Sequence, residues 1–306
     1  MTLRSLHRTA LIATWSTLAL IAFGGYTRGS GSGYGCKDRW PLCENGALGG
    51  YLPRLEPEMI VEWTHRWIAL LVGIVAIAIV VGAIRGKHDR KWIIAPAISA
   101  IVVIGFQAWL GRMVVKGDLD RDLVTVHLAV SMLVVAHFVV IVVATRSQRV
   151  KSKAPRDWRV LLGVSAIAVF IVMVLGSVVH NLYFPGWPLP DGSFVPDTSN
   201  SDALIHYFHR AFSGWTLLLL AFLVWFVRRI ERPQIEKSLV DVALAGFIVN
   251  AVLGLVHVLT EVQSSFVVAA HIGVAGIVWA ALVAAFFIAL TPKVASIEVL
   301  PVNGEQ

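Results

Sequence analysis

The sequence carries little charge for its length. Only 15% of its 306 residues are charged, whereas 57% are hydrophobic and the mean hydropathy is +0.74. A water-soluble domain could not bury that proportion of apolar side chains. The composition therefore excludes an ordinary soluble enzyme and indicates an integral membrane protein.

Three further signals are absent, and each absence excludes a class. The glycine-rich residues 29–35 have neither a strand before them nor a helix after them, which excludes a phosphate-binding loop. No aspartate-rich cluster is present to bind a diphosphate through magnesium, so a prenyl transferase is excluded. No small-residue cleavage site follows the first apolar run, so we expect it to be a retained helix rather than a signal peptide.

Long apolar runs dominate what is there. A helix needs about 20 mostly apolar residues to cross a bilayer, and the runs lack the two-residue alternation of strands. We therefore predict eight transmembrane helices. They cover roughly residues 9–27, 60–84, 92–115, 124–145, 158–180, 205–228, 238–259 and 266–290.

The net charge of +7 and the pI near 9.7 come largely from basic residues in alternate connections between these runs. The positive-inside rule places such connections in the cytoplasm. We therefore expect a multi-pass cell-membrane protein with both termini in the cytoplasm, and no nucleic-acid partner. The connections expected on the outer face are 29–58, 116–122, 181–204 and 260–265.

The chain repeats itself once. Trp63-Thr64-His65-Arg66 corresponds to Tyr207-Phe208-His209-Arg210, and the histidine that follows each pair, His127 or His271, comes 62 residues later (127 − 65 and 271 − 209). Trp40-Pro41-Leu42 is matched by Trp187-Pro188-Leu189 in a register of roughly 143–147 residues. Self-similarity of this kind indicates duplication.

The repeat predicts the architecture. We expect an all-α integral membrane protein whose eight helices form two pseudo-symmetric four-helix bundles in parallel tandem, residues 1–150 and residues 151–306. Four helices per copy is an even number, so both copies have the same orientation in the membrane.

The four repeated histidines are the strongest candidate ligands. His65 and His127 are expected at similar depth near the outer face, and so are His209 and His271. Zinc needs a third or fourth ligand in each half, and only Glu62, one helical turn from His65, is present in one half. Two facing imidazoles suit haem iron, because the porphyrin supplies the other four ligands.

Other polar residues near these histidines allow two interpretations. Arg66 and Arg210 are positioned either to pair with haem propionates or to reach lipid head groups. Cys36 and Cys43 are expected to form a disulfide in the first outer loop, and its role, structural or redox-active, stays open. His180 and His257 have no repeated partner and are not expected to be ligands.

Together these motifs resemble the haem A synthase family. The resemblance rests on the eight helices in two halves, Glu62-x-x-His65-Arg66, the second His209-Arg210, His127, His271 and the Cys36-x6-Cys43 loop. Members of this family oxidise the ring-D methyl of haem O to a formyl group by successive hydroxylations, which gives haem A for cytochrome oxidase.

The resemblance also implies roles for individual residues. His209 and His271 would ligate a haem B cofactor, His65 and His127 would face the iron of the substrate haem O, and Glu62 would be the catalytic carboxylate. Cys36 and Cys43 would be the functional disulfide. Haem O synthase, an electron donor, membrane lipid and a second copy of the chain are the partners it suggests.

The main alternative is a non-catalytic di-haem cytochrome b that carries electrons. It explains the histidine pairs, but conduction across the membrane would need ligands at two depths, and nothing in that role requires Glu62. A transporter built from parallel repeats would need helices interrupted at mid-membrane, which the sequence does not show.

Overall fold

The computed structural model describes residues 1–146, 154–180, 199, 201–260 and 263–290. Within these ranges the structure is helical, and eight helices are long and apolar enough to cross a membrane, as predicted. They are α1 (Leu3–Gly29), α3 (Pro57–Arg85), α4 (Ala95–Lys116), α5 (Arg121–Thr145), α6 (Arg156–Val179), α7 (Ser201–Val227), α8 (Gln234–Leu259) and α9 (Ser265–Leu290). The expected all-α membrane fold is confirmed.

Short elements occupy two of the connections. A 3-10 turn, η1 (Ser32–Tyr34), and a four-residue helix, α2 (Ala47–Gly50), lie in the long connection between α1 and α3. A π-helical turn, η2 (Arg90–Ile94), precedes α4. The long connection contains both cysteines and is called the disulfide loop (residues 30–56) below.

The helix boundaries follow from local sequence. Pro57 is at the first position of α3, where its missing N–H costs nothing. Asp120 caps α5 by accepting hydrogen bonds from the N–H groups of Asp122 and Leu123, each at 3.0 Å. Both helices therefore begin at fixed points a short distance before the histidines that they carry.

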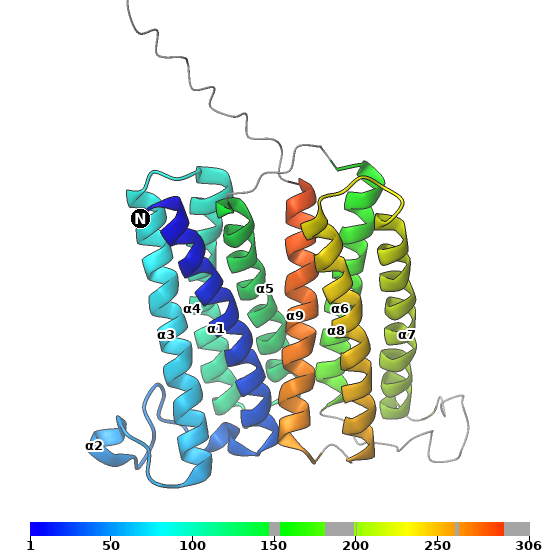
Figure 1. Cartoon of the computed structure of the whole chain (residues 1–306). Helices are drawn as coiled ribbons and strands as arrows, with labels where there is room; N and C mark the ends of the chain where they lie inside the picture. The colour runs from blue at the N-terminus through cyan, green and yellow to red at the C-terminus, as the bar shows by residue number, and fades with distance from the viewer. Residues whose placement is uncertain (147–153, 181–198, 200, 261–262, 291–306) are drawn as a thin grey trace, which may run out of the picture.

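The helices stand side by side, with α1, α3, α4 and α5 on one side of the molecule and α6 to α9 on the other (Figure 1). The N-terminus and the last residues of α9 lie at the same end of the molecule, called the N-terminal end; the disulfide loop lies at the opposite end, called the loop end. The sequence repeat is consistent with this arrangement. The division into two bundles at residue 150 stays a prediction, because one large core cluster combines residues of α6 to α9 with Leu18 of α1 and Met132 of α5.

Glycines allow α1 and α9 to pack closely between the two sides. A methyl group on Gly25 would lie 3.0 Å from Ile272 Cδ1, and one on Gly273 would lie 3.1 Å from Ala22 Cβ. Small residues at such crossings let helix backbones approach in a membrane. The Trp279 indole on α9 also donates a 2.9 Å hydrogen bond to the Met132 carbonyl on α5.

A buried polar cluster fixes the N-terminal end of the second side. Glu236 of α8 accepts hydrogen bonds from the Trp158 indole of α6 at 2.8 Å and from the Arg232 Nε at 2.8 Å. All three side chains are buried, so the carboxylate is paired rather than left as an isolated charge. The repeat of Trp40-Pro41-Leu42 predicted at Trp187-Pro188-Leu189 lies outside the described residues.

Candidate haem-binding site

The four repeated histidines lie at matching depths. His65 comes eight residues after the start of α3 (65 − 57), and His209 eight after the start of α7 (209 − 201). His127 and His271 each come six residues after the start of α5 and α9 (127 − 121 and 271 − 265). At about 1.5 Å per residue, all four sit roughly 9–12 Å from their helix starts, and all four helices start at the loop end.

Each of these histidines packs against a glycine on a neighbouring helix. A methyl group on Gly24 would lie 3.1 Å from His65 Cε1, and one on Gly111 would lie 3.2 Å from His127 Cε1. On the second side the corresponding distances are 3.0 Å for Gly176 with His209 and 3.3 Å for Gly254 with His271. Four imidazoles therefore lie against bare helix backbone, and we call Gly24, Gly111, Gly176 and Gly254 the cradle glycines.

The two nitrogens of each ring have different surroundings. In all four histidines Nδ1 is the enclosed nitrogen, and it makes no hydrogen bond of standard geometry. The rings of His209 and His271 approach the backbone carbonyls of Val172 and Asn250, each four residues before a cradle glycine. A histidine that binds metal through Nε2 commonly directs Nδ1–H at such a carbonyl. Nε2 is therefore the nitrogen that the fold presents to a ligand.

The histidines are also paired in space. His65 lies close enough to His127 for its charge to act on that ring, and His271 lies close enough to act on His209. On the first side, the Gln107 amide of α4 donates a 2.8 Å hydrogen bond to the His127 carbonyl of α5. The bond ties the helix that carries the cradle glycine to the helix that carries the ligand.

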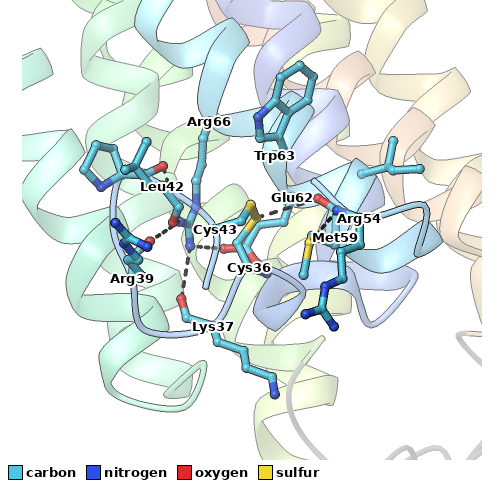
Figure 2. Close-up of a disulfide and its surroundings, with 12 residues drawn as sticks. Cys36, Lys37, Arg39, Leu42, Cys43, Arg54, Met59, Glu62, Trp63 and Arg66 are labelled. Carbon is cyan, nitrogen blue, oxygen red and sulfur yellow. Dashed lines mark hydrogen bonds and ion pairs between the residues drawn. A yellow bond between two sulfur atoms is a disulfide. The ribbon is translucent and has the colours of Figure 1, made fainter. Parts of the chain in front are cut away.

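Glu62 joins the first histidine pair to the disulfide loop. Its side chain is buried, with 3% exposed, and Oε2 accepts a 2.5 Å hydrogen bond from the Cys36 N–H. Oε1 forms an ion pair with Arg66, one turn further along α3 (Figure 2). Because Glu62 and His65 are three residues apart, they leave the helix within one turn of each other.

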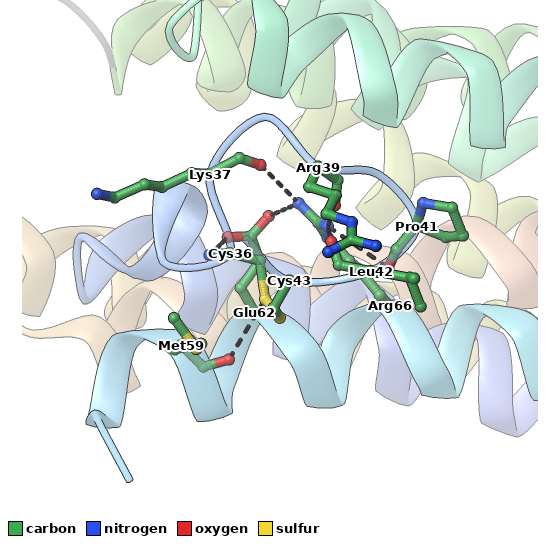
Figure 3. Close-up of polar contacts among 9 residues, drawn as sticks. All are labelled: Cys36, Lys37, Arg39, Pro41, Leu42, Cys43, Met59, Glu62 and Arg66. Atoms are coloured by element: carbon green, nitrogen blue, oxygen red, sulfur yellow. Dashed lines mark hydrogen bonds and ion pairs between the residues drawn. A yellow bond between two sulfur atoms is a disulfide. The ribbon is translucent and has the colours of Figure 1, made fainter. Parts of the chain in front are cut away.

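The Arg66 side chain binds the disulfide loop through backbone carbonyls of the loop. Nη1 donates to the carbonyls of Leu42 at 2.8 Å and Arg39 at 3.2 Å, and Nη2 donates to Glu62 and to the Lys37 carbonyl (Figure 3). The planar guanidinium presents five donors in a fixed fork. Both terminal nitrogens are thus used within the loop and Glu62, and the two interpretations of Arg66 drawn from the sequence, a haem propionate or lipid head groups, stay predictions.

Cys36 and Cys43 form a disulfide, as predicted. Both are fully buried and pack with Met59 and Trp63 of α3. The Cys43 N–H donates a 3.0 Å hydrogen bond to the Gly50 carbonyl, and the Glu44 N–H donates a 3.0 Å bond to the Cys36 carbonyl. The disulfide therefore closes a compact cap over the loop end of α3.

The second side differs at the position of Glu62. His206 occupies this position (62 + 144), is buried with 3% exposed, and lies near His209. Arg210 is partly buried beside it. An acid in one half thus corresponds to a base in the other.

The structure also gives a place to two histidines that the sequence analysis set aside. The His180 ring stacks on His257, with centroids 5.7 Å apart, and His257 lies nearly parallel to His271, with centroids 6.4 Å apart and 10° between the planes. They come from α8 and from the residue after α6, so no spacing within one helix reveals the stack. It adds two imidazoles next to one member of the second histidine pair.

The donor set fits haem better than a lone metal ion. Within the described ranges no three His, Cys, Asp or Glu side chains gather to hold a metal ion. Two imidazoles per site, each presenting Nε2 and lying in a glycine cradle, match the axial ligation that haem iron requires. Fold and site together define a class: a multi-pass helical membrane protein with two imidazole pairs near one face.

Comparison with known proteins narrows this class. The family model described as cytochrome oxidase assembly protein, COX15-CtaA, matches residues 7–283. Proteins named heme A synthase are similar over most of their length: 28% identity with that of Shouchella clausii, covering 84% of this chain and 88% of the relative, and 26% with that of Listeria monocytogenes serovar 1/2a, covering 82% and 87%. The relative from Symbiobacterium thermophilum is 24% identical, covering 77% and 80%. The chain belongs to the COX15-CtaA family, and the resemblance drawn from its motifs is confirmed.

The contacts of Arg66 predict how the loop responds to its loss. In Arg66→Ala the loop carbonyls and Glu62 lose their donor, at a cost of about 1–3 kcal/mol, and local opening should speed reduction of the Cys36–Cys43 disulfide by roughly tenfold or more. The rate is measured by trapping thiols after addition of dithiothreitol. Arg210→Ala, the matched change in the second half, should leave the rate unchanged. Equal reduction rates for Arg66→Ala and the native protein would show that the Arg66 hydrogen bonds do not hold the disulfide loop closed.

Proposed function

We propose that this protein is a haem A synthase: a membrane oxidoreductase that converts the ring-D methyl of haem O to a formyl group by successive hydroxylations, and so supplies haem A for cytochrome oxidase. One observation carries the proposal. Two imidazole pairs lie in matched glycine cradles, and among the described residues only the first pair has a buried carboxylate, Glu62, one turn away. The names of the similar proteins support the same activity.

The two pairs are assigned different haems. We propose that His209 and His271 hold a haem B cofactor and that His65 and His127 bind the iron of the substrate, haem O. We assign the substrate site to the first half because oxidation of a methyl group needs a nearby polar group, here Glu62. A site that only holds a cofactor needs no such group. Haem iron supplies the oxidising power, because a methyl C–H bond is inert to amino-acid side chains.

Glu62 is proposed to act on the substrate. A carboxylate near the reacting methyl stabilises positive charge that develops there, or accepts a proton. Its hydrogen bond from Cys36 and its ion pair with Arg66 fix the direction of the carboxylate. Such fixed groups need no rearrangement when charge develops, which is the source of their catalytic value.

Arg66 and Arg210 are proposed to assist at the haem edges. Arg210 follows a cofactor ligand directly and has the position expected for a propionate contact. Arg66 has the same position in the first half and binds the loop as well, so a substrate propionate would share this side chain with the disulfide loop. The haem sites are proposed to lie toward the outer face of the cell membrane, with both termini in the cytoplasm.

The di-haem electron carrier remains the competing function. Both histidine pairs lie near the same end of the helices, which suits a substrate site and a cofactor site side by side. Electron conduction across the membrane would need a second haem at the other depth. The buried Glu62 also has no task in that role.

Glu62→Gln tests the catalytic role. The amide oxygen still accepts the Cys36 N–H, so the loop should stay in place, but the charge is lost. We expect unchanged haem B content and a stop or stall in the conversion of haem O, measured by chromatography of extracted pigments. Glu58→Gln, an exposed change one turn earlier on α3, is the control and should convert normally. Normal haem A production by Glu62→Gln would remove Glu62 from the chemistry.

Substitutions at the cradle glycines can disrupt one histidine pair at a time, and so test the two proposed haem sites separately. Leucine at Gly176 or Gly254 would push His209 or His271 out of place, so we expect most of the haem B to be lost, measured by absorption of the purified protein. Leucine at Gly24 or Gly111 should preserve haem B and abolish conversion of haem O. Gly214→Leu is the control, because a Cβ at Gly214 meets no atom within 4 Å. Full haem B content in both second-half variants would contradict the assignment.

The histidine stack predicts a spectroscopic effect. His257→Leu removes the ring that lies parallel to His271, so the His271 plane should turn and the g-values of the low-spin ferric haem should shift. His257→Phe preserves a flat ring and should restore much of the native spectrum. Electron paramagnetic resonance of purified protein makes the measurement. Identical spectra for the native and leucine forms would show that His257 does not orient His271.

A further inference from the structure

One segment of the disulfide loop exposes more apolar surface than a water-facing loop should. In residues 47–55, called the apolar hairpin, Leu48 is 74% exposed, Tyr51 60%, Leu52 43% and Leu55 96%. Exposed apolar area costs about 25 cal/mol per Å² in water, and a contiguous patch of this kind marks a binding surface. The question is what covers it.

The hairpin forms a groove with α3. Leu48, Tyr51 and Leu52 line an open pocket of about 480 Å³ together with Trp63 and Trp67. The Trp63 indole donates a 2.9 Å hydrogen bond to the Tyr51 carbonyl, which fixes the hairpin to the helix. Apolar side chains therefore line both sides of the groove, those of the hairpin on one side and those of α3 on the other.

The helix side of the groove continues a lipid-facing stripe. Beyond Trp67, which is 39% exposed, α3 exposes Leu70, Ile74 and Ile77 at 51%, 53% and 55%. These positions recur every three or four residues and so lie on one helix face. Its continuation along a membrane-spanning helix identifies this face as the one that contacts acyl chains, and the groove is its last turn.

The hairpin lies at the right height to meet the same leaflet. Figure 1 shows α2 beside the loop end of α3, out from the flank of the helices. Its backbone is partly satisfied from within the loop: the Leu52 N–H donates to the Ala47 carbonyl at 3.2 Å, and the Gly50 carbonyl accepts from Cys43. Internal pairing is what backbone needs where water is scarce. Tyrosine and tryptophan are enriched at this depth.

We propose that the apolar hairpin docks into the head-group and acyl-chain boundary of the leaflet at the loop end, with lipid as its partner. Leu48, Leu52 and Leu55 contact acyl chains, and the exposed Arg54 lies among the head groups, where a cation meets lipid phosphate. The hairpin is joined to Cys43 by the bond to Gly50, and the disulfide loop is joined to Glu62 through Cys36. Lipid thus anchors the cap that positions the buried carboxylate.

Photo-crosslinking tests directly whether lipid contacts the hairpin. It does not measure enzyme activity, so its outcome is independent of the proposed function. Benzoylphenylalanine replaces Leu48 or Leu55 in protein held in phosphatidylcholine–phosphatidylglycerol nanodiscs. Irradiation should give lipid adducts at both positions, detected by mass spectrometry of the peptide. The same group at Asp38, an exposed polar position of the loop, should give none. Adducts to a second copy of the chain, or no lipid adduct at either leucine, would overturn the proposal.

A charge test provides a second readout. Leu48→Glu combined with Leu52→Glu should expel the hairpin from the leaflet and speed trypsin cleavage after Arg54 several-fold in the same nanodiscs. Asn45→Asp adds acidic charge to the loop outside the hairpin and should leave the rate unchanged. Mass measurement of the intact disulfide confirms that each variant has folded its loop. An unchanged cleavage rate in the double variant would show that lipid does not hold the hairpin.

Discussion

An imidazole can lie against a helix backbone only where the residue beneath it has no side chain, and this protein meets that condition at four places. At each cradle glycine the imidazole ring is in van der Waals contact with the backbone of a neighbouring helix. In each ring Nδ1 is the enclosed nitrogen, and Nε2 is the one that the fold presents to a ligand. Imidazole position, ring direction and the distance between helices are thus set by one contact, and the proposed haem binding depends on it.

The two halves share this contact and differ in what surrounds it. The first half adds Glu62, whose charge is paired with Arg66 and whose oxygen accepts from Cys36. The second half has His206 in its place and stacks His257 beside His271. The two histidine pairs therefore have the same glycine contacts, but a buried acid lies near one pair and further aromatic packing near the other.

Much of this arrangement is encoded locally and was predictable. The eight spans follow from apolar runs, the disulfide from two nearby cysteines, and the matched depth of the histidines from equal spacing. The cradles were not predictable, because Gly24 and His65 meet through helix packing and are 41 residues apart (65 − 24). The His180–His257 stack was not predicted for the same reason. It depends on how two helices are rotated relative to each other, which periodicity does not specify. Arg66 was expected either at a haem edge or among lipid head groups, and its bonds to loop carbonyls depend on a loop conformation that composition does not reveal.

The disulfide loop shows why the carboxylate is not exposed to water in spite of its position near the helix end. Glu62 lies only five residues from the start of α3 (62 − 57), where an uncovered side chain would be solvated. The Cys36–Cys43 bridge and the Arg66 fork fold the loop over it and leave it 3% exposed. Removal from water strengthens every electrostatic interaction that the carboxylate makes, because fewer solvent dipoles oppose its field. In the role proposed for Glu62, the loop that covers the acid therefore contributes to the chemistry together with the acid.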